Sequence, residues 1–114
     1  MVMREERPWG WFEILYEERG MKIKRILVKP DERLSLQSHN QRRENWTFLQ
    51  GKGLFTLDES RIEVTPHQSV YIPLQSRHRI ENIGKEDLLF VEVQTGDYLG
   101  EDDIVRYEDD YKRV

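Results

Sequence analysis

Four side chains of the kind that bind metal ions occur in two separate segments of this chain. Gln37, His39 and Glu44 lie close together, and His78 follows in a later segment. In an extended strand, residues i and i+2 point to the same face, so Gln37 and His39 would project together about 7 Å apart along the backbone. Amide, imidazole and carboxylate groups are suitable donors for a divalent ion. The pattern therefore predicts a metal site where the two segments meet.

The same residues could instead form the solvent-exposed face of an edge strand. Leu34 and Leu36 would then point to the core while Gln37 and His39 face water. If the polar face turns inward, it needs a metal ion or a ligand, because burying unpaired polar groups costs several kcal/mol. The two interpretations predict opposite orientations for these side chains.

The residues between and around these positions indicate short strands separated by turns. Apolar residues alternate with polar ones over short runs, and Gly, Pro and Asp fall between the runs. The expected strands are 11–15, 22–28, 34–39, 46–49, 53–57, 61–64, 69–72, 78–82 and 88–93. Strands of this length and spacing are typical of a sandwich or barrel, and a jelly roll is the best match. We therefore predict an all-β fold.

Two further features concern the later part of the chain. His78, Ile80 and Asn82 share one face of their strand, so His78 points inward if Ile80 does. In the segment from Gly96 to Val114, acidic residues outnumber basic ones. We expect this segment to form one short helical turn and a tail packed on the barrel.

Length and composition exclude several classes of protein. The 114 residues suffice for one modest core, so we predict a single domain over 1–114. A net charge of -4 argues against nucleic-acid and anionic-membrane binding. The absence of cysteine excludes disulfides and cysteine-ligated zinc. No signal-peptide pattern is present, and no segment approaches the ~20 apolar residues that span a bilayer, so we expect a cytoplasmic protein.

Cationic residues nevertheless cluster beside the candidate ligands in the sequence. The clusters are Lys22 with Lys24 and Arg25, Arg42 with Arg43, and Arg77 with Arg79. Such clusters are compatible with an anionic small-molecule ligand.

Two motifs resemble those of the cupin superfamily. Residues 37–51 read Gln-x-His-x4-Glu-x6-Gly, similar to the first cupin motif, and residues 73–82 resemble the second motif, Pro-x-Gly-x2-His-x3-Asn, with Gln75 at the glycine position. Five segments look like the cupin module of type II phosphomannose isomerases: 7–12, 34–39, 42–46, 69–73 and 96–104. This resemblance covers residues 7–113. The module usually forms the C-terminal part of bifunctional mannose-6-phosphate isomerase/mannose-1-phosphate guanylyltransferases and also occurs alone.

The resemblance implies a double-stranded β-helix that interconverts mannose 6-phosphate and fructose 6-phosphate, as part of mannose and polysaccharide-precursor metabolism. It carries Gln37, His39, Glu44 and His78 over as ligands of one divalent ion. We expect zinc, although Mn, Fe, Co and Ni also suit these donors. Moving a proton between C1 and C2 passes through an enediolate, which a divalent ion stabilises. The phosphate of a sugar phosphate prefers cationic side chains, and the candidates are Arg33, Arg42, Arg43 and Arg106.

The chain departs from the family where further histidines are usual. Asn40, Gln41 and Asn45 stand at these positions, and no histidine remains as a general base. Lys24, Glu81 or a water molecule at the metal would have to carry the proton. One alternative is a non-catalytic cupin that binds sugar phosphates as a sensor or as the partner of a separate nucleotidyltransferase. Another is a different metal enzyme, such as an oxygenase, because this fold hosts many reactions.

We also expect a homodimer. Phe55, Leu57, Leu88 and Phe90 are predicted to lie on alternating faces that one small core would not cover. Such uncovered apolar faces are typical of a subunit interface.

Overall fold

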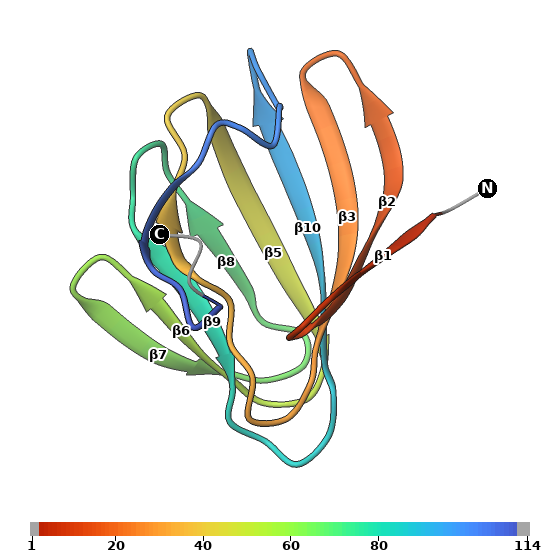
Figure 1. The fold of residues 1–114 in the computed structure, drawn as a ribbon, viewed down its shortest axis with the longest axis vertical. Helices are drawn as coiled ribbons and strands as arrows, with labels where there is room; N and C mark the ends of the chain where they lie inside the picture. The colour runs from red at the N-terminus through yellow and green to blue at the C-terminus, as the bar shows by residue number, and fades with distance from the viewer. Residues whose placement is uncertain (1–2, 112–114) are drawn as a thin grey trace.

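The computed structural model describes residues 3–111, which form strands joined by turns (Figure 1). The strands are β1 (Arg4–Arg7), β2 (Gly10–Glu18), β3 (Met21–Val28), β4 (Leu36–Ser38), β5 (Arg42–Gln50), β6 (Gly53–Leu57), β7 (Ser60–Val64), β8 (Ser69–Ile72), β9 (His78–Asn82), β10 (Leu88–Gly96) and β11 (Val105–Glu108). The all-β prediction is confirmed. Residues 1–2 and 112–114, which fall within the predicted domain, lie outside the described residues.

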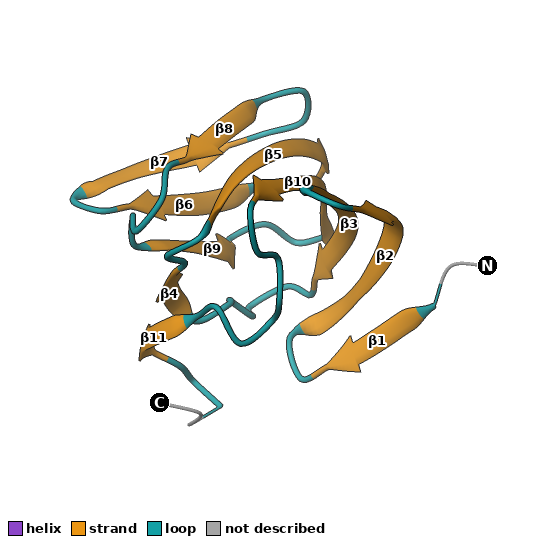
Figure 2. Cartoon of the chain, turned by 90° about the horizontal axis from the view of Figure 1, so that it is seen from above, coloured by secondary structure: helices purple, strands orange, loops and turns teal. Residues whose placement is uncertain are grey.

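The strands form two antiparallel sheets in a jelly-roll arrangement. The larger sheet has the order β1-β2-β3-β10-β5-β8, and the smaller has the order β11-β4-β9-β6-β7. Figure 2 shows the two sheets facing each other, with the loop from β10 to β11 lying between β1 and β11. The described part of the chain contains no helix that could cross a membrane.

The inner face of the larger sheet changes from polar to apolar along its strands. Because directly paired residues share a face, the registers of β3, β10 and β5 define rows across the sheet. From the polar end, these rows are Lys22–Gln94–Glu44, Lys24–Glu92–Trp46 and Ile26–Phe90–Phe48. The apolar end packs into the core, and residues of the polar end line a pocket.

The core is a cluster of aliphatic and aromatic side chains from both sheets: Trp9, Ile26, Val28, Leu34, Trp46, Phe48, Phe55, Val64, Ile72, Ile80, Leu88 and Phe90. Phe55, Leu88 and Phe90 belong to this core, and Leu57 packs against it. Their predicted position on uncovered faces is therefore wrong, because all four side chains point to the inside of the barrel. The homodimer stays a prediction, without the support of these residues.

The predicted helical turn near the C-terminus is also wrong. A turn at residues 100–103 is closed by a hydrogen bond from the Asp103 amide to the Gly100 carbonyl at 3.1 Å. The chain then continues as β11, which pairs with β4 at the edge of the smaller sheet. Gly96 begins this segment, and a Cβ there would lie 2.2 Å from the Gln41 carbonyl oxygen. Tertiary pairing, which local composition does not encode, decides the structure here.

Asn82 ties β9 to two neighbouring segments. Its Nδ2 donates to the carbonyls of Val28 and Glu86 at 2.8 and 2.9 Å, and its Oδ1 accepts from the Gly84 amide at 2.9 Å. The side chain is buried. Asn82→Ala leaves these backbone groups without partners, so we expect a loss of about 2–3 kcal/mol in the free energy of unfolding.

Urea titration of Asn82→Ala would measure this loss. The matched control is Asn45→Ala, at an exposed position on the outer face of β5, with an expected change within about 0.5 kcal/mol. Equal stabilities for the two variants would contradict this role for Asn82.

Candidate metal centre

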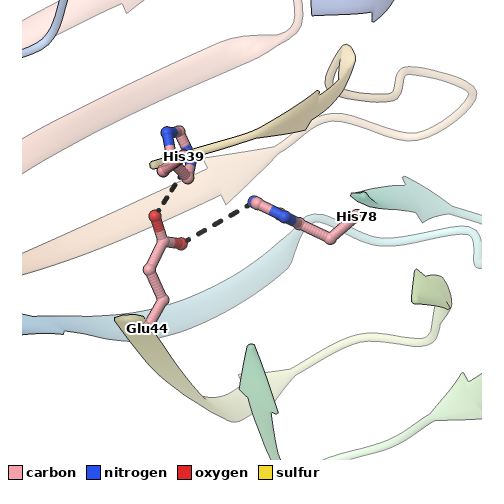
Figure 3. A group of neighbouring side chains, drawn as sticks. All are labelled: His39, Glu44 and His78. Atoms are coloured by element: carbon pink, nitrogen blue, oxygen red, sulfur yellow. Dashed lines mark ion pairs between the residues drawn. The ribbon is translucent and has the colours of Figure 1, made fainter. Parts of the chain in front are cut away.

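Three predicted ligands converge at the polar end of the barrel (Figure 3). His39 follows β4, Glu44 lies on β5, and His78 begins β9. His39 Nε2 is 3.2 Å from Glu44 Oε2, and His78 Nε2 is 3.9 Å from Glu44 Oε1. One ligand atom from each residue lies within 4.8 Å of the other two, and all three residues are buried. This group could hold a metal ion.

The two imidazoles are held in the form that binds metals. His39 Nδ1 is 2.7 Å from the Asp103 carbonyl, and His78 Nδ1 is 3.0 Å from the Ser76 carbonyl. Because a carbonyl only accepts, each Nδ1 carries the hydrogen and each Nε2 keeps a lone pair on the side of Glu44, where that of His39 accepts from Arg42 Nη2 at 3.2 Å.

Electrostatics also keep both rings neutral. Burial, followed by the charges of Arg42 and His78, lowers the pKa of His39 to about 3. Burial is also the largest cause that lowers the pKa of His78, to about 4. Neutral imidazole is the ligand form of histidine.

Gln37, the fourth predicted ligand, lies in the middle of β4. It pairs directly with His78 and lines the same pocket. Gln37 and His39 therefore face inward, as the metal-site interpretation requires. Two neutral imidazoles, a carboxylate and an amide form a donor set that fits a divalent ion.

The Glu44 carboxylate has two further partners. Arg42 Nε donates to Oε2 at 2.8 Å, and Trp46 Nε1 donates to Oε1 at 2.9 Å. Arg42 Nη2 lies 3.2 Å from His39 Nε2. Arg42 Nη1 is buried and has no hydrogen-bond partner among residues 3–111. The site thus contains a guanidinium group with one unused donor.

The pocket around this cluster has a volume of about 260 Å³. β1 and β2 contribute Arg7 and Phe12 to its wall, and the segment between β10 and β11 contributes Glu101 and Ile104. Elements distant in sequence therefore complete a site whose ligands come from β4, β5 and β9.

Glu92 is a residue of this pocket that was not predicted from the sequence. It is buried on β10, accepts a hydrogen bond from Gln94 at 2.7 Å and lines the pocket. Burial, followed by the negative charge of Glu44, raises the pKa of Glu92 to about 7. A carboxyl group of this kind can take up or release a proton near neutral pH. The sequence does contain a feature that could have identified Glu92. It lies two residues after Phe90 in an apolar strand, so the strand period places this glutamate on the same inward face.

Three of the predicted catalytic and substrate residues line this pocket: Lys24, Arg42 and Arg106. Lys24 comes from β3, and its Nζ donates to Glu101 Oε1 at 2.5 Å. Arg106 comes from β11. The structure therefore brings these cationic groups to the ligand cluster.

Glu81, Arg33 and Arg43 are not brought to the cluster. Glu81 and Arg33 line a second hollow on the outer face of the smaller sheet. Arg33 there makes two hydrogen bonds to Asp110, at 2.8 and 2.9 Å. Arg43 is exposed on the outer face of β5. The remaining histidine, His67, lies in an exposed turn with a φ of 77°.

Comparison with known proteins identifies relatives that are similar to this chain in sequence. Residues 2–109 match the family model for the mannose-6-phosphate isomerase C-terminal region. The xanthan biosynthesis protein XanB of Xanthomonas campestris pv. campestris is 48% identical over 108 residues, which cover 95% of this chain and 23% of that protein. Mannose-1-phosphate guanylyltransferase 2 of Escherichia coli O157:H7 is 45% identical over 106 residues, covering 93% and 22%. The chain spans less than a quarter of the length of these relatives.

A solved structure supports the fold. The capsular polysaccharide assembling protein CapF from Staphylococcus aureus superposes with a TM-score of 0.81, over 95% of this chain and 33% of that chain. Because the sequences are only 21% identical, the similarity concerns the jelly-roll architecture alone.

Proposed function

The chain belongs to the mannose-6-phosphate isomerase C-terminal family of cupin domains, and from this premise we propose that it is a metal-dependent mannose-6-phosphate isomerase. The reaction would interconvert mannose 6-phosphate and fructose 6-phosphate and supply mannose 6-phosphate for polysaccharide precursors. The observation that carries the proposal is the buried group His39, Glu44 and His78 at the base of a pocket lined by cationic side chains.

The residues of the chain have separable roles in this proposal. A divalent cation bound by Gln37, His39, Glu44 and His78 would supply positive charge beside the C1 and C2 oxygens of the sugar. We propose zinc, and Mn, Fe, Co and Ni suit the same donors. The Asp103 and Ser76 carbonyls orient the imidazoles, and Trp46 orients the carboxylate. Of the predicted proton carriers, Glu81 lies outside the pocket and the Lys24 ammonium is paired with Glu101 at 2.5 Å, which leaves a water molecule as the carrier in this proposal.

Turnover of mannose 6-phosphate by the metal-loaded protein tests the proposal. Purified protein is stripped with a chelator, reloaded with a single divalent metal and incubated with mannose 6-phosphate, and fructose 6-phosphate is detected by a coupled assay. We expect at least one metal to raise the rate about tenfold or more above that of the stripped protein. Rates equal to the stripped control with Zn, Mn, Fe, Co and Ni would reject the proposal.

A non-catalytic sugar-phosphate-binding module is the second candidate. Two observations favour it: His67 does not line the pocket, and the relatives include a guanylyltransferase of which this chain covers 22%. In this case the chain would act as a sensor or as the partner of a separate nucleotidyltransferase. Micromolar binding of mannose 6-phosphate by calorimetry, with no turnover, would favour this function over the isomerase.

A further inference from the structure

Two lysines point into the pocket beside the ligand cluster. Lys22 and Lys24 lie on the inner face of β3 and line the pocket, and their side chains are only 6% and 7% exposed. A lysine is almost never buried unless its charge is paired. The group that pairs with these ammonium charges therefore indicates which kind of ligand this part of the pocket can bind.

The partner is a carboxylate from the 97–104 loop, which joins β10 to β11. Glu101 Oε1 is 2.5 Å from Lys24 Nζ and 3.7 Å from Lys22 Nζ. Lys22 Nζ also donates to the Leu99 carbonyl at 3.0 Å and lies 3.5 Å from Glu17 Oε2. The Glu101 side chain is itself 57% exposed. Exposed carboxylates thus balance the two buried ammonium groups: Glu101 lies near both, and Glu17 lies near Lys22 as well.

The charge of this carboxylate is maintained by the cations around it. Burial acts to raise the pKa of Glu101, but the attraction of Lys24, Arg42 and Lys22 outweighs it and lowers the pKa. Arg42 contributes a second observation, because its buried Nη1 has no hydrogen-bond partner in the described part of the chain. The same pocket therefore contains an unused cationic donor as well as two lysines.

The spacing between the lysines and the ligands suits a sugar phosphate. Lys22 and Glu44 lie in one row of the larger sheet, separated by Gln94 on β10. Two strand spacings place their backbones roughly 10 Å apart. This separation is comparable with the length of an extended six-carbon chain that ends in a phosphate.

We propose that Lys22 and Lys24 form the subsite for the phosphate group of the substrate, and that Glu101 occupies this subsite until a phosphate displaces it. The inference rests on the proposed function for the identity of the sugar. A phosphate carries about -1.5 to -2 charges and several acceptor oxygens, so it interacts with the cations more strongly than one carboxylate does. Of the arginines predicted to bind phosphate, Arg33 and Arg43 lie outside this pocket.

The loop can release Glu101 without leaving the barrel. Both Asp103 carboxylate oxygens accept backbone hydrogen bonds at 2.9 Å, from the amides of Asn40 and Gln41. The Asp103 carbonyl also holds His39 Nδ1. Displacement therefore requires movement of the Glu101 side chain, while the ligand His39 keeps its orientation.

Phosphate binding tests this subsite without requiring turnover. The full chain is titrated by calorimetry with inorganic phosphate and with a hexitol 6-phosphate, which cannot isomerise, both as purified and after chelation. We expect Glu101→Gln to tighten binding about threefold or more, because the internal competitor loses its charge, and Lys24→Gln to weaken it about tenfold. Lys52→Gln and Glu63→Gln, which remove an exposed ion pair elsewhere, should leave the affinity unchanged.

Unchanged phosphate affinity in Glu101→Gln would overturn the inference. Glutamine at this position keeps an oxygen that can accept from Lys24, and circular dichroism verifies that the variant is folded, so it decides the question even if Lys24→Gln is unstable. A protein that binds phosphate through Lys24 but does not isomerise rejects the proposed function alone. A protein that isomerises while both variants bind phosphate like the parent rejects the subsite alone.

Discussion

Replacing His39 or His78 with alanine is expected to lower the affinity for a divalent cation by more than about 100-fold, because even changes in the outer shell of a metal site typically cost 10–100-fold. Both Nε2 atoms face Glu44, and each ring is fixed through Nδ1 by a backbone carbonyl. Removing one imidazole leaves a donor set that the remaining residues cannot complete. The proposed isomerase turnover is expected to disappear with the metal. Competition against a chromophoric chelator measures the affinity, and the coupled assay measures turnover.

The third histidine supplies a matched control. His67 lies in an exposed turn at a φ of 77°, where asparagine is tolerated better than most residues. His67→Asn should therefore retain metal affinity and turnover within about twofold of the parent. Circular dichroism verifies that the alanine variants are folded. A folded His39→Ala protein that binds zinc as tightly as His67→Asn would eliminate this metal centre.

The ligand cluster could be predicted because strand periodicity is local. A period of two places Gln37 with His39, and Glu44 with Trp46, on shared faces, and the structure has both pairs lining the pocket. The same rule indicates that Arg43, next to Glu44, faces the other side of β5. It also indicates that Glu81, three residues after His78, points away from the pocket. Both placements follow because each residue is an odd number of positions from a ligand on its own strand.

Arg33 shows where the alternation of side chains between the two faces of a strand no longer predicts orientation. It has the same parity as Gln37 and His39, yet it lines the outer hollow. The chain between β3 and β4 is irregular, and Arg33 there forms only an isolated bridge with Glu81. Strand alternation therefore does not extend across this segment.

Other parts of the site depend on long-range pairing. Lys22 and Glu44 share a row only because β10 pairs with both β3 and β5. Glu101 reaches Lys24 across 77 positions of sequence. β1 and β11, which were not predicted as strands, form edges whose partners are β2 and β4. Local patterns do not contain these registers, since they are fixed by tertiary structure.

The apolar end of the barrel supports the candidate metal ligands through a row of contacts between aromatic rings. The ring centroids of Phe90 and Trp46 are 4.6 Å apart, and those of Phe90 and Phe48 are 5.3 Å apart. Trp46 in turn donates to Glu44. Core packing and carboxylate orientation therefore depend on the same side chains.

Phe90→Ala is accordingly expected to lower the free energy of unfolding by about 3–5 kcal/mol, because it leaves a cavity where the ring is completely buried. Leu89→Ala changes the neighbouring residue, which is half-buried on the opposite face of β10, and should cost about 1 kcal/mol. Guanidinium titration of both variants measures the difference. Since the Phe90 ring also packs on Trp46, metal affinity should fall in Phe90→Ala and not in Leu89→Ala. Equal stability losses in the two variants would show that this aromatic cluster does not hold the barrel together.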